Sequence, residues 1–475
     1  MDAVAALQLR CDPARPAVVA FTGAGGKSSL LFRLAHELVQ QGTRVILTTT
    51  TLLAATQCQT AAAWLAMEPG AMPWDGVDAG FDHTLDQALT AHGQCLITST
   101  DQIVRQGIRK QVGLTPMDVE RLVDRAEKLG VGAILVEADG SRMHPVKAPA
   151  EHEPVVPACA THVVAVAGID AVGRPLTEAF VHRPAAMRAT LQLPPDAQPL
   201  ITPAMLARLL AHPHGGRKHV PAHAHFFPFI NKVDSPPRLA TAQVVAAQLV
   251  AHGTAALLGA AGAPDLPLMR ARWAPWTAVI LAAGGSRRMG APKQVAQLDG
   301  KPLVIYAVQQ ALAAGAAEVL VVTGAYGALV EDALAERKQG GGVPVRVVHN
   351  AEWQSGQASS MHAAVRGLAA TMAGALFLPV DQPFVPVALL RRLVDGWQGG
   401  APLVAPRVDG HLRGAPCFFD RSLFPELMAV QGDVGGRAVL QRHAATARGI
   451  LTLAATLDDI DTPQQLDQAR KNIVG

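Results

Sequence analysis

Apolar positions along the chain fall into two patterns that alternate. Short continuous runs rich in valine, isoleucine, leucine and alanine are followed by longer segments in which apolar residues recur with helical spacing. The first pattern is typical of buried strands and the second of amphipathic helices. Because neighbouring parallel strands must be joined by a crossover, usually a helix, the alternation predicts parallel sheets covered by helices. We therefore expect an α/β fold throughout.

In the first half of the chain, the apolar runs predict strands with helices between them. Two helix starts are also marked, because Thr115 and Thr202 are capping-type residues that each precede a proline. The predicted strands are Ala17–Thr22, Arg44–Thr50, Gln94–Thr98, Ala133–Glu137, His162–Ala167 and Phe226–Ile230.

A second series of strands and helices begins after Gly259–Pro275, a stretch rich in glycine and proline. We place a domain boundary there and expect domains at residues 1–265 and 266–475, since the chain is too long for one ordinary core. The second series comprises strand Thr277–Ala282, helix Pro302–Ala314, strand Glu318–Thr323, helix Ala328–Lys338, strand Val345–His349, helix Ala358–Ala370 and strand Ala375–Val380.

Composition and charge narrow the class of protein. Hydrophobic residues make up 49% of the chain and charged residues 17%, which suits a globular protein. The net charge is only +3 and no dense basic run occurs, so nucleic acid is not an expected partner. No signal-like segment or bilayer-spanning apolar run is present, so no membrane partner is expected either. The five cysteines lack paired spacing, which favours a cytoplasmic location over a disulfide framework.

A glycine-rich segment follows the first strand of the second domain and is expected to be a loop over a ligand. Glycine lets the backbone approach phosphate oxygens, and successive amide groups form an anion-binding nest. Arg288 and Lys293 add positive charge and are candidate catalytic residues, so the loop suits a triphosphate. A plain strand-to-helix turn is the alternative. The candidate nucleotide-binding residues here are Leu281, Ala282, Ala283, Gly284, Gly285 and Ser286.

Asp381 directly follows a hydrophobic strand and is the third candidate catalytic residue. In open α/β sheets, ligands bind beyond the carboxyl ends of the strands, so Asp381 and the glycine-rich loop can face one site. We expect Asp381 to hold Mg²⁺ while an acceptor phosphate attacks the α-phosphorus of the nucleotide. A helix N-cap is the alternative role. Asp459 and Asp461 are candidates for a second metal ligand, and capping is the alternative for Asp461.

Five segments of the second domain together resemble the MobA-like nucleotidyltransferases, and within these the molybdenum cofactor cytidylyltransferase branch. The resemblance implies a Rossmann-like domain that transfers CMP from CTP to molybdopterin with Mg²⁺ and releases pyrophosphate. Ala282 and Ala283 are similar to the cytidylyl branch, whereas guanylyl relatives tend to have glycine at the position of Ala283. The segments are Leu281–Lys293, Gly300–Leu303, Val380–Pro383, Arg413–Pro416 and Gly432–Gly435.

The first predicted strand of the chain leads into another glycine-rich loop, which joins it to an amphipathic helix as a phosphate-binding loop requires. This pattern predicts a P-loop NTPase-like domain with a parallel sheet. Lys27 would reach the β- and γ-phosphates, and Ser28 would reach the magnesium ion. The standard motif has glycine where this chain has Phe21, which is a departure. The candidate residues are Gly23, Gly25, Gly26, Lys27 and Ser28.

Two further segments of the first domain favour a nucleotide site. Glu137 ends an apolar strand, followed by Asp139, and is a candidate metal ligand beside Ser28. The segment Asn231–Asp234 follows another strand and resembles the guanine-reading Asn-Lys-x-Asp motif of GTPases, so Asn231 and Asp234 are candidate nucleotide-binding residues. Both ATP and GTP stay open as the ligand of this domain.

The first domain also resembles the YqeC family of selenium-dependent molybdenum hydroxylase accessory proteins. The resemblance implies an accessory step in hydroxylase maturation, with a hydroxylase apoenzyme as a partner besides the molybdopterin-type small molecule. Its segments are Gly23–Ser29, Thr48–Thr51, Val136–Ser141, Lys147–Pro154 and Asn231–Asp234.

Two rival functions stay open at this point. One is a nucleotidyltransferase that acts on a sugar or polyol phosphate, since those enzymes share the loop that contains Arg288 and Lys293. The other is a non-catalytic cofactor chaperone or insertion factor. The presence of Arg288, Lys293 and Asp381 together speaks against it, because a pure binder needs no charge placed for a leaving pyrophosphate.

Overall fold

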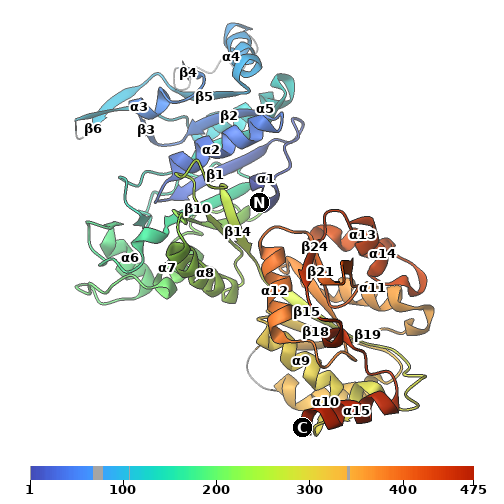
Figure 1. Ribbon diagram of the computed structural model, residues 1–475. Coiled ribbons are helices and arrows are strands. Elements are labelled where there is room, and N and C mark those ends of the chain that lie inside the picture. The colour runs from blue at the N-terminus through green and yellow to red at the C-terminus, as the bar shows by residue number, and fades with distance from the viewer. Residues whose placement is uncertain (1, 68–78, 106, 340–342, 475) are drawn as a thin grey trace. The chain divides into compact units, whose positions relative to one another are not determined.

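The computed structural model describes residues 2–67, 79–105, 107–339 and 343–474, which form two compact units (Figure 1). The first unit is Met1–Trp273 and the second is Ala274–Gly475. The expected domain boundary lies eight residues earlier than this division, because the stretch proposed as a linker contains a strand, β14 (Met269–Trp273), that pairs with the sheet of the first unit.

The first unit is built on a nine-stranded sheet in the order β14-β13-β12-β10-β1-β8-β2-β5-β4. Its neighbouring strands run parallel except for β14, which pairs antiparallel with β13 at the edge. The strands are β1 (Ala17–Gly23), β2 (Arg44–Thr49), β4 (Trp64–Met67), β5 (Gln94–Ser99), β8 (Val131–Glu137), β10 (His162–Gly168), β12 (His225–Asn231), β13 (Ala256–Gly259) and β14.

Helices cover both faces of this sheet, because alternate residues of the buried strands point to opposite sides. Val19 and Phe21 of β1 pack with α1 and α2, whereas Val18 and Ala20 pack with α4 and α5. Helices α6, α7 and α8 cover the same face as α4 and α5 further along the sheet. The helices are α1 (Ala3–Leu7), α2 (Lys27–Gln40), α3 (Ala55–Cys58), α4 (Ala79–His92), α5 (Pro116–Leu129), α6 (Pro184–Leu191), α7 (Pro203–Ala211) and α8 (Pro236–Ala251).

Two small sheets complete the first unit. Strands β3 (Leu52–Ala54), β6 (Gln102–Arg105) and β7 (Ile108–Val112) form an antiparallel sheet in the order β3-β7-β6. Strands β9 (Val146–Lys147) and β11 (Val181–His182) form a short parallel pair that positions Lys147.

The second unit has an eight-stranded sheet whose parallel half holds the candidate site. The strands run in the order β19-β18-β15-β20-β23-β21-β22, and β24 pairs with β21. β15 is parallel to both β18 and β20, while β23 begins the antiparallel half. The strands are β15 (Trp276–Ala282), β18 (Glu318–Thr323), β19 (Val345–His349), β20 (Gly374–Pro379), β21 (Leu403–Val408), β22 (His411–Leu412), β23 (Cys417–Asp420), β24 (Arg448–Leu451) and the separate pair β16 (Gln297–Leu298) and β17 (Lys301–Pro302).

Helices α11, α13 and α14 pack on one face of this sheet against residues such as Val279, Phe377 and Phe419. Among the described helices, none is both long enough and apolar enough to cross a membrane. The helices of the unit are α9 (Leu303–Ala313), α10 (Gly327–Gln339), α11 (Gln357–Gly367), α12 (Val387–Gln398), α13 (Phe424–Ala429), α14 (Arg437–Arg442) and α15 (Pro463–Val474). The mixed α/β architecture predicted from the apolar pattern is confirmed.

Candidate functional site

The loop between β1 and α2, residues 23–27, is tightly held by its neighbours, and we call it the N-terminal glycine loop. Gly25 has a φ of +84°, and a Cβ there would lie 2.3 Å from Gly168 N. Gly26 has a φ of +113°, and a Cβ there would lie 2.5 Å from the Asn231 side chain. Only glycine tolerates this combination of positive φ and close approach. The sequence therefore shapes a glycine loop that leads directly into the start of helix α2, the position at which helix N-termini bind anions.

Lys27 points back over this loop and is almost fully buried, with a side-chain exposure of 1%. Its Nζ donates to Gly23 O at 2.8 Å and lies 3.1 Å from Asp139 Oδ1 and 3.8 Å from Glu137 Oε1. Burial alone lowers the pKa of Lys27, but the two carboxylates outweigh burial and raise the pKa above its ordinary value. Lys27 is thus a fixed cation whose charge is held by carboxylates.

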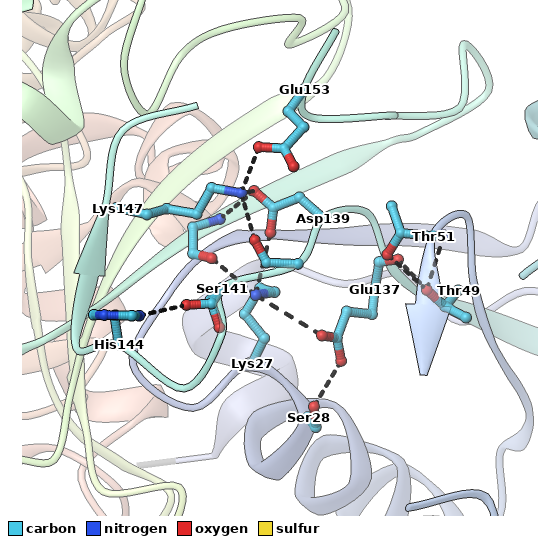
Figure 2. Close-up of polar contacts among 12 residues, drawn as sticks. Lys27, Ser28, Thr49, Thr51, Glu137, Asp139, Ser141, His144, Lys147 and Glu153 are labelled. Atoms are coloured by element: carbon cyan, nitrogen blue, oxygen red, sulfur yellow. Dashed lines mark hydrogen bonds and ion pairs between the residues drawn. The ribbon is translucent and has the colours of Figure 1, made fainter. Parts of the chain in front are cut away.

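Ser28 and Glu137 meet beside Lys27, as Figure 2 shows. Ser28 Oγ donates a hydrogen bond to Glu137 Oε2 at 2.7 Å, and Glu137 comes from the end of β8. Burial raises the pKa of Glu137, and the nearby Lys27 charge and the Ser28 hydrogen bond partly offset this effect. A hydroxyl and a carboxylate oxygen are ligands that Mg²⁺ prefers when substrate phosphates supply the rest. The pair therefore fits the metal that the sequence implied.

Oppositely charged side chains alternate from Lys27 through Asp139, Lys147 and Glu153 to Arg183, and we call this set the ion-pair chain. Asp139 Oδ2 lies 3.0 Å from Lys147 Nζ, and Lys147 Nζ lies 2.8 Å from Glu153 Oε2. Arg183 Nη2 donates to Glu153 Oε1 at 3.1 Å. The Lys147 and Asp139 side chains are only 1% and 2% exposed. Breaking one member of such a buried set leaves an uncompensated charge, which costs about 3–5 kcal/mol.

The predicted guanine-reading residues lie in different settings. Asn231 is buried, and its Nδ2 donates to Gly25 O at 2.8 Å while its Oδ1 accepts from Ala261 N at 2.9 Å. Asp234 is exposed and forms an ion pair with Arg238 of α8 at 2.7 Å. Asn231 therefore braces the N-terminal glycine loop, and the structure does not bring Asp234 to Lys27.

In the second unit, β15 ends at Ala282 and leads into the loop of residues 283–293, the C-terminal glycine loop. Gln294, which is fully buried, donates to Ala282 O at 3.0 Å and to Gly284 O at 2.6 Å. Ser286 Oγ accepts a hydrogen bond from Lys293 N at 3.1 Å. These contacts close the loop on itself and fix the start of the segment that holds Lys293.

Lys293 meets the carboxylates predicted for this site. Its Nζ forms an ion pair with Asp381, which follows β20, and lies 3.1 Å from Asp461 Oδ1. Arg288 forms an ion pair with Asp461 at 2.8 Å, and its side chain is 73% exposed. Burial lowers the pKa of Lys293, but Asp381 and Asp461 outweigh burial and raise it. The structure therefore brings Arg288, Lys293 and Asp381 together, with Asp461 as the connecting residue.

The side chains of Gln382 and Asp459 extend this cluster. Gln382 Nε2 donates to Asp459 Oδ1 at 3.0 Å, and Ile460 N donates to Asp381 O at 2.9 Å, which ties residues 459–461 to the end of β20. Burial and the charges of Asp381 and Asp461 raise the pKa of Asp459. No preformed group of three ligand-type side chains occurs in the described ranges. Asp381 and Asp461 still fit Mg²⁺, which is commonly held by one or two carboxylates and substrate phosphates.

Sequence patterns missed several residues that shape these sites. The resemblance to YqeC included the segment Lys147–Pro154, but this segment has no helical or strand periodicity, so nothing in the spacing of Lys147 and Glu153 indicated that they meet Asp139. Gln294 follows Lys293 directly, and only the loop's need to satisfy its carbonyl groups could have indicated its role.

Comparisons with known proteins match a different family in each of the two units. The family model described as "YqeC protein" matches residues 19–185, and the "MobA-like NTP transferase domain" matches residues 278–447. YqeC of Escherichia coli (strain K12) is 34% identical over 221 residues, which cover 46% of this chain and 77% of that protein. Nicotine blue oxidoreductase of Paenarthrobacter nicotinovorans is 33% identical over 215 residues, covering 43% and 98%.

Among solved structures, the chain resembles that of Rv0371c from Mycobacterium tuberculosis H37Rv. The TM-score is 0.36 at 25% identity, and the match covers 42% of this chain and 98% of that one. The two family matches and the identity to YqeC assign each half of the chain to a family. The chain therefore belongs to the YqeC family through its N-terminal unit, which is fused to a C-terminal MobA-like NTP transferase domain.

Proposed function

We propose that the C-terminal unit transfers CMP from CTP to molybdopterin and releases pyrophosphate. The observation that carries the proposal is the cluster of Lys293, Asp381 and Asp461 beside the C-terminal glycine loop. The cluster lies beyond the carboxyl end of β20, where ligands of open α/β sheets bind. Lys293 and Asp381 also lie within the residues that match the MobA-like NTP transferase domain, which supports a nucleotidyltransferase role for the cluster.

In this reaction, a phosphate oxygen of the acceptor forms a bond to the α-phosphorus of CTP while the bond from the α-phosphorus to pyrophosphate breaks. Lys293 and Arg288 exchange carboxylate partners for triphosphate oxygens and offset the charge that gathers on the leaving pyrophosphate. Asp381 and Asp461 would hold Mg²⁺, which would supply further positive charge at the triphosphate. The loop amides around Gly284 and Gly285 orient the phosphates by donating hydrogen bonds.

We assign the base and the acceptor on the resemblance to the cytidylyl branch at Ala282 and Ala283. The acceptor is then a molybdopterin-type small molecule, and a molybdenum hydroxylase apoenzyme would receive the finished cofactor. A sugar or polyol phosphate acceptor is the alternative, since the loop chemistry is shared. Screening acceptors separates the two.

For the N-terminal unit we propose binding of ATP or GTP with Mg²⁺ in support of the same maturation pathway. Lys27 would contact the β- and γ-phosphates, and Ser28 and Glu137 would hold the metal, as their 2.7 Å hydrogen bond suggests. Asn231 supports this site by bracing Gly25 rather than by contacting a base.

The test measures pyrophosphate release by the full chain with molybdopterin and each of the four nucleoside triphosphates. We expect CTP to be preferred, and Asp381→Asn to lower turnover by on the order of 100- to 1000-fold, the usual loss for one preorganised electrostatic group. Asp467→Asn is the matched control, because Asp467 is 65% exposed and pairs with Arg470 on α15. Tight binding of the finished cofactor without any turnover would favour the chaperone alternative instead.

A further inference from the structure

The two oxygens of the Asp139 carboxylate have different partners. Oδ2 accepts a hydrogen bond from the Gly23 amide at 3.0 Å and lies 3.0 Å from Lys147 Nζ. Oδ1 lies 3.1 Å from Lys27 Nζ and accepts no hydrogen bond of good geometry from any residue that the structure describes. One oxygen is therefore anchored by two donors, and the other depends on Lys27 alone.

A triphosphate in the N-terminal glycine loop would remove that single partner. Phosphate oxygens would attract the Lys27 ammonium away from Oδ1. The Gly23 amide and Lys147 would keep their contacts with Oδ2. Oδ1 would then be a free, buried acceptor on a carboxylate whose other oxygen is fixed. The position of Asp139 also suits this role, because Glu137 two residues earlier meets Ser28 at the expected metal position between the β- and γ-phosphates.

The surroundings of Asp139 provide space and charge for a water molecule. Asp139, Gly23 and Lys147 line a small pocket whose remaining walls include Ala165 and Leu209. Lys147 offsets the charge of Asp139, which would otherwise repel the γ-phosphate. The Lys147 ammonium donates to Glu153 Oε2 at 2.8 Å (Figure 2). It also donates to Gly140 O at 2.7 Å, so its position is fixed by two acceptors besides Asp139.

We propose that the N-terminal unit hydrolyses the triphosphate that it binds, with Asp139 as the catalytic residue that orients the attacking water and Lys147 as its positioning residue. The water oxygen forms a bond to the γ-phosphorus while the bond from the γ-phosphorus to the β–γ bridging oxygen breaks. The nucleoside diphosphate leaves with that electron pair, and one water proton passes to an oxygen of the released phosphate. The inference rests on the proposed nucleotide site.

The experiment measures orthophosphate release by the full chain with ATP or GTP and Mg²⁺, without CTP or molybdopterin. Orthophosphate distinguishes this activity from the C-terminal reaction, which releases pyrophosphate. Asp139→Asn is expected to lower kcat by about 100-fold or more, while the Kd of a non-hydrolysable triphosphate changes by less than about 3-fold. Asp86→Asn is the control, because Asp86 is a half-exposed carboxylate paired with Arg44 in the same unit.

Two further variants keep the test decisive if Asp139→Asn does not fold. Asp139→Glu retains the charge but displaces the carboxylate, and we expect intact binding with kcat reduced by about 10- to 100-fold. Lys147→Met is expected to lower kcat by about 10-fold or more with KM nearly unchanged, and Lys147→Arg to recover most of that loss. A merely structural role for Lys147 would change binding and turnover together.

The outcomes separate this inference from the nucleotide site on which it rests. Full activity of the Asp139 variants, or a wild-type chain that binds the triphosphate and releases no phosphate, would overturn the hydrolysis proposal alone. Absence of triphosphate binding by the wild type, or binding that Lys27→Met leaves unchanged, would overturn the nucleotide site as well.

Discussion

The Glu153 carboxylate accepts hydrogen bonds from two cationic side chains, and this gives the N-terminal unit a defined response to acid. Burial raises the pKa of Glu153, but the bonds from Arg183 and Lys147 outweigh burial and hold its pKa at about 2. The ordinary value is 4.5, so the unfolded chain takes up the proton first as the pH falls. The stabilisation is complete above about pH 4.5 and is lost between there and pH 2. It amounts to roughly 3 kcal/mol.

We predict that Glu153→Gln lowers the thermal stability of the chain at pH 7 and removes part of its decline between about pH 4.5 and pH 2. Lys147 loses one of its two ionic partners in this variant and Arg183 loses its ion pair, which explains the loss at neutral pH. Circular dichroism during heating at several pH values measures both effects, with the exposed Glu127→Gln as the control. A decline with acid as steep as that of the wild type would show that Glu153 is not responsible.

The close packing around Gly25 leads to a second prediction for a single residue. In Gly25→Ala, the new Cβ would meet Gly168 N at 2.3 Å and Pro145 O at 2.6 Å, both backbone atoms that cannot move easily. We expect triphosphate affinity at the N-terminal site to fall at least about 10-fold and stability to fall by about 1–3 kcal/mol. Gly42→Ala separates strain from clash, because Gly42 has a φ of +80° with nothing within 4 Å. Equal effects in the two variants would contradict the packing argument.

At the scale of elements, the apolar pattern predicted the central strands well because these strands are buried on both faces. β18 has the predicted bounds, and β1 extends the predicted strand by one residue. The partly exposed edge strand β19 also has the predicted bounds. Both capping threonines precede helices as expected, α5 after Thr115 and α7 after Thr202. Helix α11 ends at Gly367 rather than Ala370, since helix ends depend on local capping that periodicity does not encode.

The elements that sequence reasoning missed lie at edges or outside the regular pattern. β14 reads Met-Arg-Ala-Arg-Trp, which has no continuous apolar run, so Gly259–Pro275 resembled a linker. The same limit applies to the candidate sites. Lys27, Ser28 and Glu137 could be predicted because each adjoins a strand or loop motif. The resemblance to YqeC included Lys147 and Glu153, but their contacts with Asp139 depend on the path of an irregular segment, which no periodicity reveals.

The edge strand β14 provides a prediction about where the first unit ends. Leu268 and Met269 are buried against the core that contains Phe229 and Leu257. A chain that ends at residue 265 should therefore unfold at a lower temperature than one that ends at residue 274, because it exposes this core and the edge of β13. Thermal unfolding of the two truncated chains measures the difference. Equal midpoints would show that β14 adds nothing to the unit.

At the scale of the whole molecule, each unit places a lysine beside two carboxylates near the carboxyl end of a parallel strand, and this lysine is buried in the first unit and partly buried in the second. Lys27 lies between Asp139 and Glu137, and Lys293 lies between Asp381 and Asp461. In both sites, bound phosphate would replace the carboxylates as the ionic partner of the lysine. The carboxylates would then be able to contact a metal ion or a water molecule. The two sites share no described residue, so we expect each to bind its own nucleotide when the other is disabled.

The central claim is that one chain contains two separate nucleotide sites with different reactions. The most direct measurement follows triphosphate binding at the N-terminal site and pyrophosphate release from CTP and molybdopterin in the full-length Lys27→Met and Asp381→Asn variants. We predict that Lys27→Met loses triphosphate binding at the N-terminal site and keeps pyrophosphate release. Asp381→Asn is expected to lose pyrophosphate release and keep triphosphate binding. Loss of both activities in either folded variant, or pyrophosphate release that Asp381→Asn leaves unchanged, would contradict this account.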